Sequence, residues 1–519
     1  MPLARVCAKT SLVVLAAMVV GWAGCAVEDN QIVRENGLQG TSEWATADSD
    51  VAKDEIQAYG SAASVSPGET LHLFVSTKVA GTPYSARVIR LGWYGGKGGR
   101  SLAIQTGIGQ AQGAYNAANI VLVGCSSCTF DPATRRVDAH WQESLSFEIP
   151  SGWQSGRYVV KLTDAANKQT YVPFIVRGNQ AAPYVVVLPD NTTAAYNDWG
   201  GWSLYHGPDH QLASRAYAVS FDRPNLFWRV GAGHGLPYEV DAIHWLEREG
   251  YAVEYLSSID LHQHPEWLLT HRAYISLGHD EYWSSEMRDG VERMRDSGLG
   301  LAFYGANAAY WRVQFGPNDD GVQDRVMTCY KAAPNNADPA SGMDPAQWTT
   351  RWRDPPLSRP ENSLIGIAYV DWIQPRGGFP WVADPNAKSQ LLANTGVLPG
   401  ASYGCNYVGY EWDAVIDNGA GPKNLAILGT SPTDSESGTK SVSNTTYYLS
   451  QSGGLVFASG SINWAYALDD FRQLDQEDPA YPDFSNLDCL AHSASAKPIQ
   501  ELMKHVMKTL ISKNAEDSL

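Results

Sequence analysis

The spacing of apolar residues divides the chain into two regions with different predicted structures. From residue 29 to about 178, short runs such as LHLFVS, ARVIRLGWY, LSFEI and RYVVKL alternate apolar and polar positions, with Gly, Pro, Ser and Asn between them. Alternation places every second side chain on the same face, which is typical of half-buried strands. Many short strands separated by turn residues predict a β-sandwich for residues 29–178.

Beyond residue 182 the apolar residues follow other periods. Four continuous apolar runs predict buried strands, at YVVVLPD, YAVEYLSS, RAYISLG and LGLAFYG. Helical spacing is found in YEVDAIHWLEREG, in SSEMRDGVERMRDSG with Ser284 or Ser285 as its N-cap, and in the final PIQELMKHVMKTLISK. Strands that alternate with helices imply a parallel sheet with helices on both faces. The sequence therefore predicts a doubly wound α/β domain over residues 182–515.

The pattern loosens between about 330 and 455, where Pro-, Gly- and Trp-rich segments contain only short predicted strands. We interpret this stretch as an insertion that decorates the α/β domain. Long insertions of this kind often shape a pocket. Two domains, at 29–178 and 182–515, account for the whole pattern after the N-terminus.

Residues 1–25 have the pattern of an export signal. Arg5 and Lys9 precede the apolar run SLVVLAAMVVGWAG, and the run ends in small residues before Cys25. Ala23-Gly24-Cys25 is similar to a bacterial lipobox, so Cys25 is predicted to carry a lipid anchor, with ordinary signal cleavage nearby as the alternative. No later segment offers the roughly 20 apolar residues of a transmembrane helix. We expect an exported protein, anchored in the cell envelope by lipid or secreted.

Charge and composition narrow the class of protein. The chain has 519 residues, a formal net charge of -17, 44% hydrophobic and 18% charged residues. These proportions are typical of a globular protein. Nucleic-acid binding needs a basic face, and no Lys/Arg stripe is present, so nucleic acid is not expected as a partner.

Seven cysteines are too few for a disulfide scaffold in a chain of this length. Cys125 and Cys128 lie in GCSSCTF, without the second pair of a zinc site and without the βαβ context of a redox motif. In an oxidising compartment we expect them to form a local disulfide. Cys329, Cys405 and Cys489 are interpreted as buried free thiols.

Polar side chains follow three of the predicted parallel strands. They are His279, Asp280 and Glu281 in GHDEYW, Asn307 after LAFYG, and Tyr196, Asn197 and Asp198 in AAYNDWGGWSLY. Ligands of open α/β sheets bind at the carboxyl ends of the strands, so these groups are expected to converge. Taken singly, the acids can simply cap a helix and Tyr196 can simply be a packed aromatic.

Several reaction classes lack their sequence signatures. The GxSxG elbow of α/β-hydrolases and the HExxH of zinc proteases are absent, and Cys329 lies inside the strand-like VMTCYK instead of a nucleophile turn. A water molecule activated by a metal ion or by carboxylates is the route that remains.

A set of blocks resembles one known family. LGWYGGKGGR, SGRYVVKL, AAYNDWGGWSLY, IHWLEREGYAVEY, SLGHDEYWSSEMRD, LAFYGANAAYWRV, RWRDPP and GYEWD are similar to segments of the large (β) subunit family of N,N-dimethylformamidase. The likeness is dense from about 184 to 470 and thinner from about 40 to 178. It implies a β-sandwich joined to a domain like that of the class I glutamine amidotransferases, without their cysteine nucleophile, and hydrolysis of an amide C–N bond.

The resemblance also implies a mononuclear iron bound by two tyrosines and one glutamate. Tyr196 and Glu281 match two of these ligands by motif position, and Tyr158 of SGRYVVKL is matched to the third. Phenolate and carboxylate are hard anionic ligands that suit ferric iron. A tyrosine has a pKa near 10, and a bound trivalent cation supplies the field that ionises it.

Four more residues match pocket positions of the family. The resemblance implies that His279 carries a proton or supports the metal ligands, that Glu411 of GYEWD is the general base, and that Asn307 and Lys331 orient the carbonyl and stabilise its oxyanion. The alternatives are helix capping for Asn307, a solvated charge for Lys331, and a surface carboxylate or structural hydrogen bonding for Glu411 and His279.

The chain departs from the family in its export signal. The formamide-cleaving enzymes act with a small partner subunit, which nothing in this sequence indicates, and a homo-oligomer is left open. A small amide is the expected substrate of a metal-dependent hydrolase. The main alternative is a non-catalytic, lipid-anchored surface protein that binds a ligand, and a further one is carbohydrate processing by paired carboxylates, which depends on their separation.

Overall fold

The computed structural model describes residues 30–519, with the exception of 117, 119, 227, 332–341, 343, 375–376 and 470–495. The predicted signal peptide at 1–25, the predicted lipid-anchor residue Cys25, and Cys489 lie outside the described residues. Residues 31–519 pack as one compact unit, and the domain limits expected at 178 and 182 stay a prediction. No helix within the described ranges is long and apolar enough to cross a membrane.

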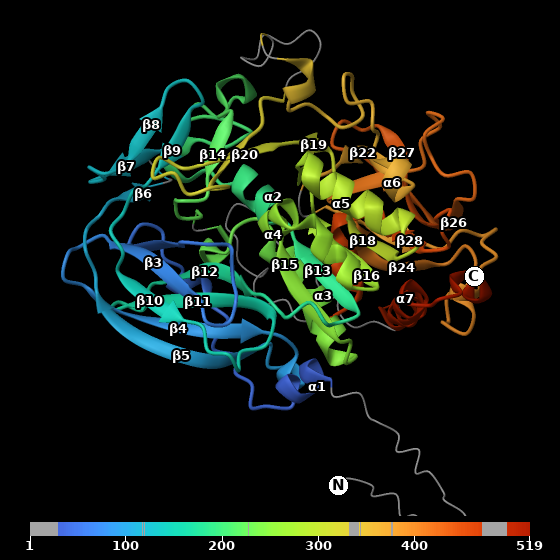
Figure 1. Ribbon diagram of the computed structural model, residues 1–519, viewed down its shortest axis with the longest axis horizontal. Helices are drawn as coiled ribbons and strands as arrows, with labels where there is room; N and C mark the ends of the chain where they lie inside the picture. The colour runs from blue at the N-terminus through green and yellow to red at the C-terminus, as the bar shows by residue number, and fades with distance from the viewer. Residues whose placement is uncertain are drawn as a thin grey trace, which may run out of the picture. The chain divides into compact units, whose positions relative to one another are not determined.

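The strand-rich first region forms two main sheets (Figure 1). The larger has the order β2 (Ser64–Val65), β12 (Gln169–Val176), β11 (Gly156–Asp164), β4 (Pro83–Leu91), β5 (Gly99–Ile108). The smaller has the order β1 (Ile56–Gly60), β3 (Thr70–Thr77), β10 (Leu145–Glu148). Leu71, Leu73 and Val75, at alternate positions of β3, share one core with Val88 and Val160 of the larger sheet. The predicted alternating strands are confirmed, and their assignment to a β-sandwich stays a prediction.

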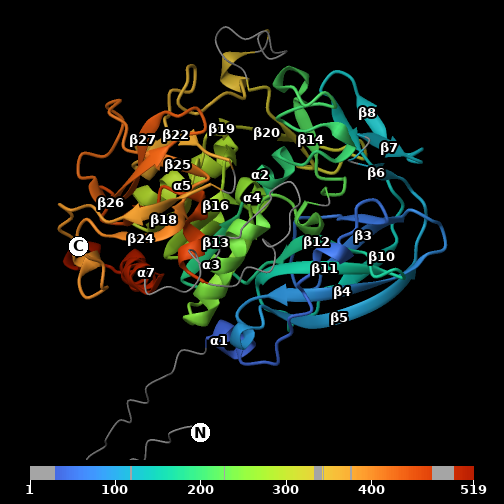
Figure 2. The ribbon, with the colours of Figure 1, turned by 180° about the vertical axis from the view of Figure 1, so that it is seen from behind.

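A seven-stranded sheet organises the second region (Figures 1 and 2). Its order is β15 (Val253–Ser257), β13 (Tyr184–Leu188), β16 (Ala273–His279), β18 (Gly300–Ala306), β28 (Leu455–Ala458), β27 (Lys440–Leu449), β26 (Ala426–Asp434). The first five strands are parallel, and β27 pairs antiparallel with both β28 and β26. The last part of the stretch interpreted as an insertion thus extends the main sheet.

Helices cover both faces of this sheet. α3 (Leu236–Arg248) and α7 (Ala496–Leu510) pack in one core, whereas α4 (Ser258–Gln263) and α5 (Ser285–Asp296) pack in a second core on the other side of the parallel strands. Side chains alternate between these cores along β13, with Val186 in the first and Val185 in the second. The fold is therefore a strand-rich mixed α/β fold. Its likeness to the class I glutamine amidotransferases stays a prediction.

Local sequence explains where α5 begins and ends. Ser284 is its N-cap and accepts a hydrogen bond from the backbone N–H of Met287, which satisfies a donor of the first turn. Gly298 follows the helix with φ of 79°, a left-handed conformation that favours glycine. The N-cap agrees with the prediction from the sequence.

The remaining elements are short and connect or flank the main sheets. They are α1 (Gln31–Asn36), α2 (Asp190–Ala195), α6 (Asn362–Ile365), β6 (Ala114–Asn116), β7 (Val121–Val123), β8 (Thr129–Asp131), β9 (Arg136–Asp138), β14 (Ala218–Ser220), β17 (Tyr282–Trp283), β19 (Trp311–Arg312), β20 (Gln314–Gly316), β21 (Val326–Thr328), β22 (Ala368–Trp372), β23 (Phe379–Val382), β24 (Ser402–Val408) and β25 (Glu411–Ala414).

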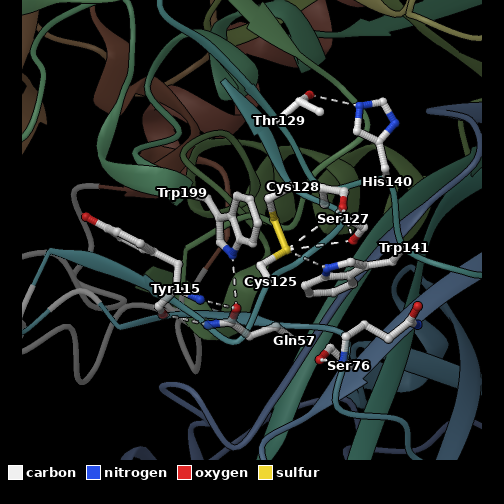
Figure 3. Close-up of a disulfide and its surroundings, with 12 residues drawn as sticks. Gln57, Ser76, Tyr115, Cys125, Ser127, Cys128, Thr129, His140, Trp141 and Trp199 are labelled. Atoms are coloured by element: carbon white, nitrogen blue, oxygen red, sulfur yellow. Dashed lines mark hydrogen bonds between the residues drawn. A yellow bond between two sulfur atoms is a disulfide. The ribbon is translucent and has the colours of Figure 1, made fainter. Parts of the chain in front are cut away.

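The Cys125–Cys128 disulfide is present, as predicted (Figure 3). Trp141 donates its indole N–H to Cys125 Sγ at 3.5 Å and packs edge-on against Trp199, which follows α2. The hairpins of the first region therefore support a loop of the second. Cys329 is free and buried, as expected. Cys405 is disulfide-bonded, so its interpretation as a free thiol is wrong.

Candidate active site

Three strand ends of the main sheet meet at Glu281, which lies between β16 and β17. Its backbone N–H donates to Thr192 Oγ1 of α2 at 2.9 Å, so the segment after β13 is fixed against it. Its carbonyl oxygen accepts the N–H groups of Tyr310 and Trp311, both at 2.9 Å, from the segment that follows β18. The structure thus brings Tyr196, His279, Glu281 and Asn307 together. The other three residues expected there bond elsewhere: Asp280 accepts from Ser276 Oγ at 2.8 Å, Asn197 donates to the carbonyl of Pro224 at 2.9 Å, and Asp198 pairs with His206 at 3.3 Å.

Two phenol groups donate to the same oxygen of Glu281. Tyr196 approaches Oε2 at 3.1 Å and Tyr205 at 2.7 Å, and the hydroxyl of Tyr282 bonds to that of Tyr205 at 2.9 Å. Burial, and then the charge of Glu281, raise the pKa of Tyr196 and of Tyr205 well above the usual value. Both phenols therefore keep their protons in the absence of a cation.

His279 links this carboxylate to a second one. Its Nε2 lies 3.3 Å from Glu281 Oε2 and 3.3 Å from Glu411 Oε2. Burial alone would lower the pKa of His279, but the two carboxylates outweigh it and raise the pKa to about 10. Burial likewise opposes ionisation of Glu281, yet hydrogen bonding from His279 and the charges of His279 and Lys331 hold its pKa below the usual value. His279 and Glu281 are therefore an imidazolium beside a carboxylate at neutral pH.

Asn307 and Lys331 complete the group. Asn307 donates from Nδ2 to Glu411 Oε2 at 2.8 Å and from its backbone N–H to Asp413 Oδ1 at 2.8 Å. The ammonium of Lys331 lies 3.6 Å from the centre of the Tyr205 ring. Asn307 and Lys331 have φ of 53° and 50°, a left-handed backbone that costs energy in non-glycine residues and is enriched at functional sites.

Tyr158 does not join this cluster. It lies on β11 with its ring stacked on Trp153 and packed in the core shared by the two sheets of the first region. Its hydroxyl donates to the backbone carbonyl of Gln154 at 2.6 Å. Tyr158 faces this apolar layer because of its position in an alternating strand, so the structure corrects its expected place: the second phenol at Glu281 belongs to Tyr205.

Sequence reasoning missed three residues of the cluster. Tyr205 ends the block AAYNDWGGWSLY, and Tyr410 immediately precedes Glu411 in GYEWD, so both were within motifs that had been recognised. His234, in GAGHGLP, had no such signal. The hydroxyl of Tyr410 lies 3.1 Å from His234 Nε2 and 3.0 Å from His279 Nδ1, so it connects the two histidines.

A second group of acidic and histidine side chains occurs at Asp138, His140 and Asp319. Arg136 donates to Asp138 Oδ2 at 2.5 Å and also bonds to Asp319. A guanidinium that is always charged thus pairs with both carboxylates. Arg136 is therefore the ion-pair partner of both acids, although Asp138 Oδ1 is buried without a hydrogen bond from the residues that the structure describes.

Two comparisons with known proteins point to the same family. A sequence model described as "N,N-dimethylformamidase beta subunit-like, C-terminal" matches residues 85–480. The N,N-dimethylformamidase beta subunits of Alcaligenes sp and Paracoccus aminophilus are 23% and 22% identical to the chain over 406 and 405 residues. Each alignment covers 64% of this chain and 52% of the relative. The chain therefore spans about half the length of the curated relatives it matches.

Among solved structures, a cycloisomaltooligosaccharide glucanotransferase of Paenibacillus sp. aligns with 51% of this chain and 57% of its own at 9% identity. The TM-score is 0.18, which carries no argument about fold or function.

Proposed function

The chain belongs to the N,N-dimethylformamidase beta subunit-like family, and on that premise we propose that it is a hydrolase that cleaves the C–N bond of an amide. The observation that carries the proposal is the meeting of two phenols and an imidazole at one oxygen of Glu281. Buried polar groups without a structural need to be there are costly, so such a concentration points to chemistry.

The residues present fit the mononuclear iron that the family resemblance implies. Tyr196, Tyr205 and Glu281 offer three hard oxygen donors, and the phenol protons that now point at the carboxylate are those that a trivalent cation would replace. We propose that these three residues hold a mononuclear ferric ion. When bound, such an ion supplies a Lewis acid that polarises a carbonyl and acidifies water.

Glu411 is the proposed general base. Its Oε2 is held by Asn307 at 2.8 Å and faces His279 at 3.3 Å, so the carboxylate has a fixed direction. Glu411 takes a proton from the attacking water, and His279 Nε2 gives a proton to the departing nitrogen. The proton on Glu411 then returns to His279, which restores both groups.

Asn307 and Lys331 are proposed to stabilise the oxygen of the amide as it gains negative charge. An amide N–H and an ammonium held in place before the reaction cost no reorganisation during it. The aromatic ring beneath Lys331 fixes its ammonium without neutralising it. The same charge lowers the pKa of Glu281, so Lys331 lies within electrostatic reach of the site.

We further propose that the protein is exported and lipid-anchored at Cys25. The signal-like sequence supports this, and so do the Cys125–Cys128 disulfide and the disulfide-bonded Cys405, because disulfides persist in oxidising compartments. The relatives are beta subunits, that is, parts of enzymes with more than one kind of subunit. Assembly of this chain with a second copy or with another subunit is accordingly a proposal.

Metal analysis and absorption spectroscopy of the purified protein test the function. We expect one iron per chain, a visible phenolate-to-iron band, and turnover of small amides, all of which are lost in Glu281→Ala. Glu286→Ala, at a glutamate whose side chain is 55% exposed on α5, is the matched control and should change none of them.

A colourless, iron-free protein whose amide turnover is the same in Glu281→Ala would refute the proposal. Stoichiometric iron without turnover of any amide would favour the alternative of a surface binding protein.

A further inference from the structure

His234, a half-buried residue just before α3, contacts two different parts of the proposed site. Its Nε2 lies 3.0 Å from His279 Nδ1, and its ring stacks on that of Tyr196 with centroids 4.3 Å apart and an angle of 8°. Resting on the proposed function, we propose that His234 is a positioning residue. It holds the Tyr196 phenol in its direction and fixes the orientation of the His279 imidazole.

The hydrogen bonds of His279 support the second role. One nitrogen, Nε2, faces the two carboxylates, and the other, Nδ1, has His234 Nε2 and the Tyr410 hydroxyl as partners, both at 3.0 Å. An imidazole that is hydrogen-bonded at both nitrogens cannot flip its ring without breaking both sets of contacts. Partners of this kind orient the groups that act directly on a metal or substrate.

The packing of Tyr196 supports the first role. Its ring has the Tyr205 ring at 4.2 Å and the His234 ring at 4.3 Å. The His234 ring is stacked on Tyr196 and the Tyr205 ring is tilted to it by 31°, and aromatic pairs at these separations are favourable beyond simple burial. The phenol oxygen of Tyr196 is therefore aimed at Glu281 by the two rings that it packs against.

The glycines beside His234 explain how it reaches this position. A Cβ on Gly233 would lie 2.4 Å from Thr193 Cγ2, and Gly233 has φ of 80°. Gly235 donates its N–H to Thr193 Oγ1 at 3.1 Å, and a Cβ there would lie 2.9 Å from the same oxygen. Only residues without a side chain allow this approach to α2, the helix that leads directly into Tyr196.

Two substitutions separate the two contacts. His234→Phe keeps a flat ring for Tyr196 but removes the nitrogen that meets His279. We expect iron affinity and the phenolate band to stay as in the wild type, while kcat falls about 10- to 100-fold with KM unchanged. His234→Gln keeps a polar group of similar reach but removes the ring. We expect iron affinity to fall about 3- to 10-fold and the band to shift, with kcat per bound iron little changed.

A readout without iron tests the His279 contact directly. In protein with ¹⁵N-labelled histidine and no metal, His234→Phe should shift the Nδ1 resonance of His279, which His279→Gln identifies by its disappearance. His264→Phe, at a histidine whose side chain is 43% exposed and outside the site, is the control.

Wild-type values in both variants would overturn the proposal, as would equal loss of affinity, kcat and band in both, because the two contacts would then not be separable. A wild-type protein that binds no iron would instead refute the proposed function. The ¹⁵N shifts would still decide whether His234 orients His279.

Discussion

Glu247 and Glu281 are both buried, and both are surrounded by hydroxyl and cationic donors, but they use these donors differently. Arg90 bonds to both oxygens of Glu247 at 2.7 and 2.8 Å, and Tyr255 and Asn36 add one donor to each oxygen at 3.1 and 2.7 Å. At Glu281 the donors Tyr196, Tyr205 and His279 all meet Oε2. Oε1 receives no hydrogen bond from any residue that the structure describes.

The difference separates a structural ion pair from the proposed active site. Arg90 lies on β4 of the first region and Glu247 on α3 of the second, so their ion pair joins the two regions. Both side chains are 0% exposed. A guanidinium keeps its proton under all ordinary conditions, so this pair cannot exchange its cation. Phenol and imidazolium protons can be exchanged, so the donors at Glu281 can give way to a metal ion or move during a reaction.

The largest expected effect lies at the site and concerns turnover alone. Glu411→Gln preserves the shape of the side chain and the hydrogen bond from Asn307 but removes the proposed general base. We expect kcat to fall about 10²- to 10⁴-fold, with iron content and the free energy of unfolding close to those of the wild type. Steady-state kinetics with metal analysis measure this, and Glu436→Gln, at an exposed glutamate, is the control. Normal turnover in Glu411→Gln would remove this residue from the mechanism.

Arg90→Met breaks the structural pair instead. It leaves Glu247 buried without its cation, which costs about 3–5 kcal/mol in the free energy of unfolding. Urea denaturation measures the loss, and kcat of the folded fraction should be unchanged. The double variant Arg90→Met/Glu247→Leu should recover most of the stability, because no buried charge is left alone. A loss under about 1 kcal/mol in the single variant contradicts this account of the pair.

A third buried glutamate, Glu239, is expected to make the stability of the protein depend on pH. Burial, and then the charges of Asp190 and Asp280, raise its pKa from 4.5 to about 7, and the nearby Arg157 only partly opposes this. The folded protein therefore binds this proton more tightly than the unfolded chain. The resulting stability is complete below pH 4.5 and is lost as the pH rises through 7.

The expected loss is about 3 kcal/mol, since each pKa unit is worth about 1.4 kcal/mol. Glu239→Gln cannot ionise, so its stability should fall less than that of the wild type between pH 5 and pH 8. Urea denaturation of both proteins at the two pH values measures how much more stability the wild type loses. Other buried acids contribute equally to both proteins and do not affect this difference. Parallel pH profiles for both proteins would show that Glu239 is ionised throughout.

The sequence predicted what periodicity and strand ends determine. β13, β15, β16, β18 and the helices α3, α5 and α7 follow from apolar spacing, which reports burial directly. The places of Tyr196, Glu281 and Asn307 follow because parallel strands deliver their ends to one edge. These predictions needed no knowledge of how distant loops fold.

The places of Tyr158 and Tyr205 depended on such knowledge. Alternation in β11 shows that Tyr158 points inward but not which layer it meets. Tyr205 returns to the site because Gly200 and Gly201, with φ of 83° and 87°, turn the chain back after α2. His234 likewise depends on the close approach of its flanking glycines to Thr193. Contacts between loops leave no periodic signal.

The smallest effects come from removing one hydroxyl from each cluster. Tyr255→Phe deletes the 3.1 Å hydrogen bond to Glu247 Oε1, but Arg90 still holds that oxygen. We expect a loss of about 1–2 kcal/mol in the free energy of unfolding and no change in iron affinity. Tyr205→Phe deletes the 2.7 Å bond to Glu281, and here iron affinity should fall at least about 10-fold while stability changes by less than about 1 kcal/mol.

Urea denaturation and iron titration of the two phenylalanine variants test the comparison within one experiment. The hydroxyl of Tyr255 serves a carboxylate whose oxygens are both already bonded to a permanent cation, so its loss is felt only in folding. The hydroxyl of Tyr205 donates to Glu281, whose donors converge on Oε2 and can be replaced by a metal ion. If Tyr255→Phe weakened iron binding as much as Tyr205→Phe, the two clusters would be coupled across α3, and the separation of a structural pair from a reactive site would fail.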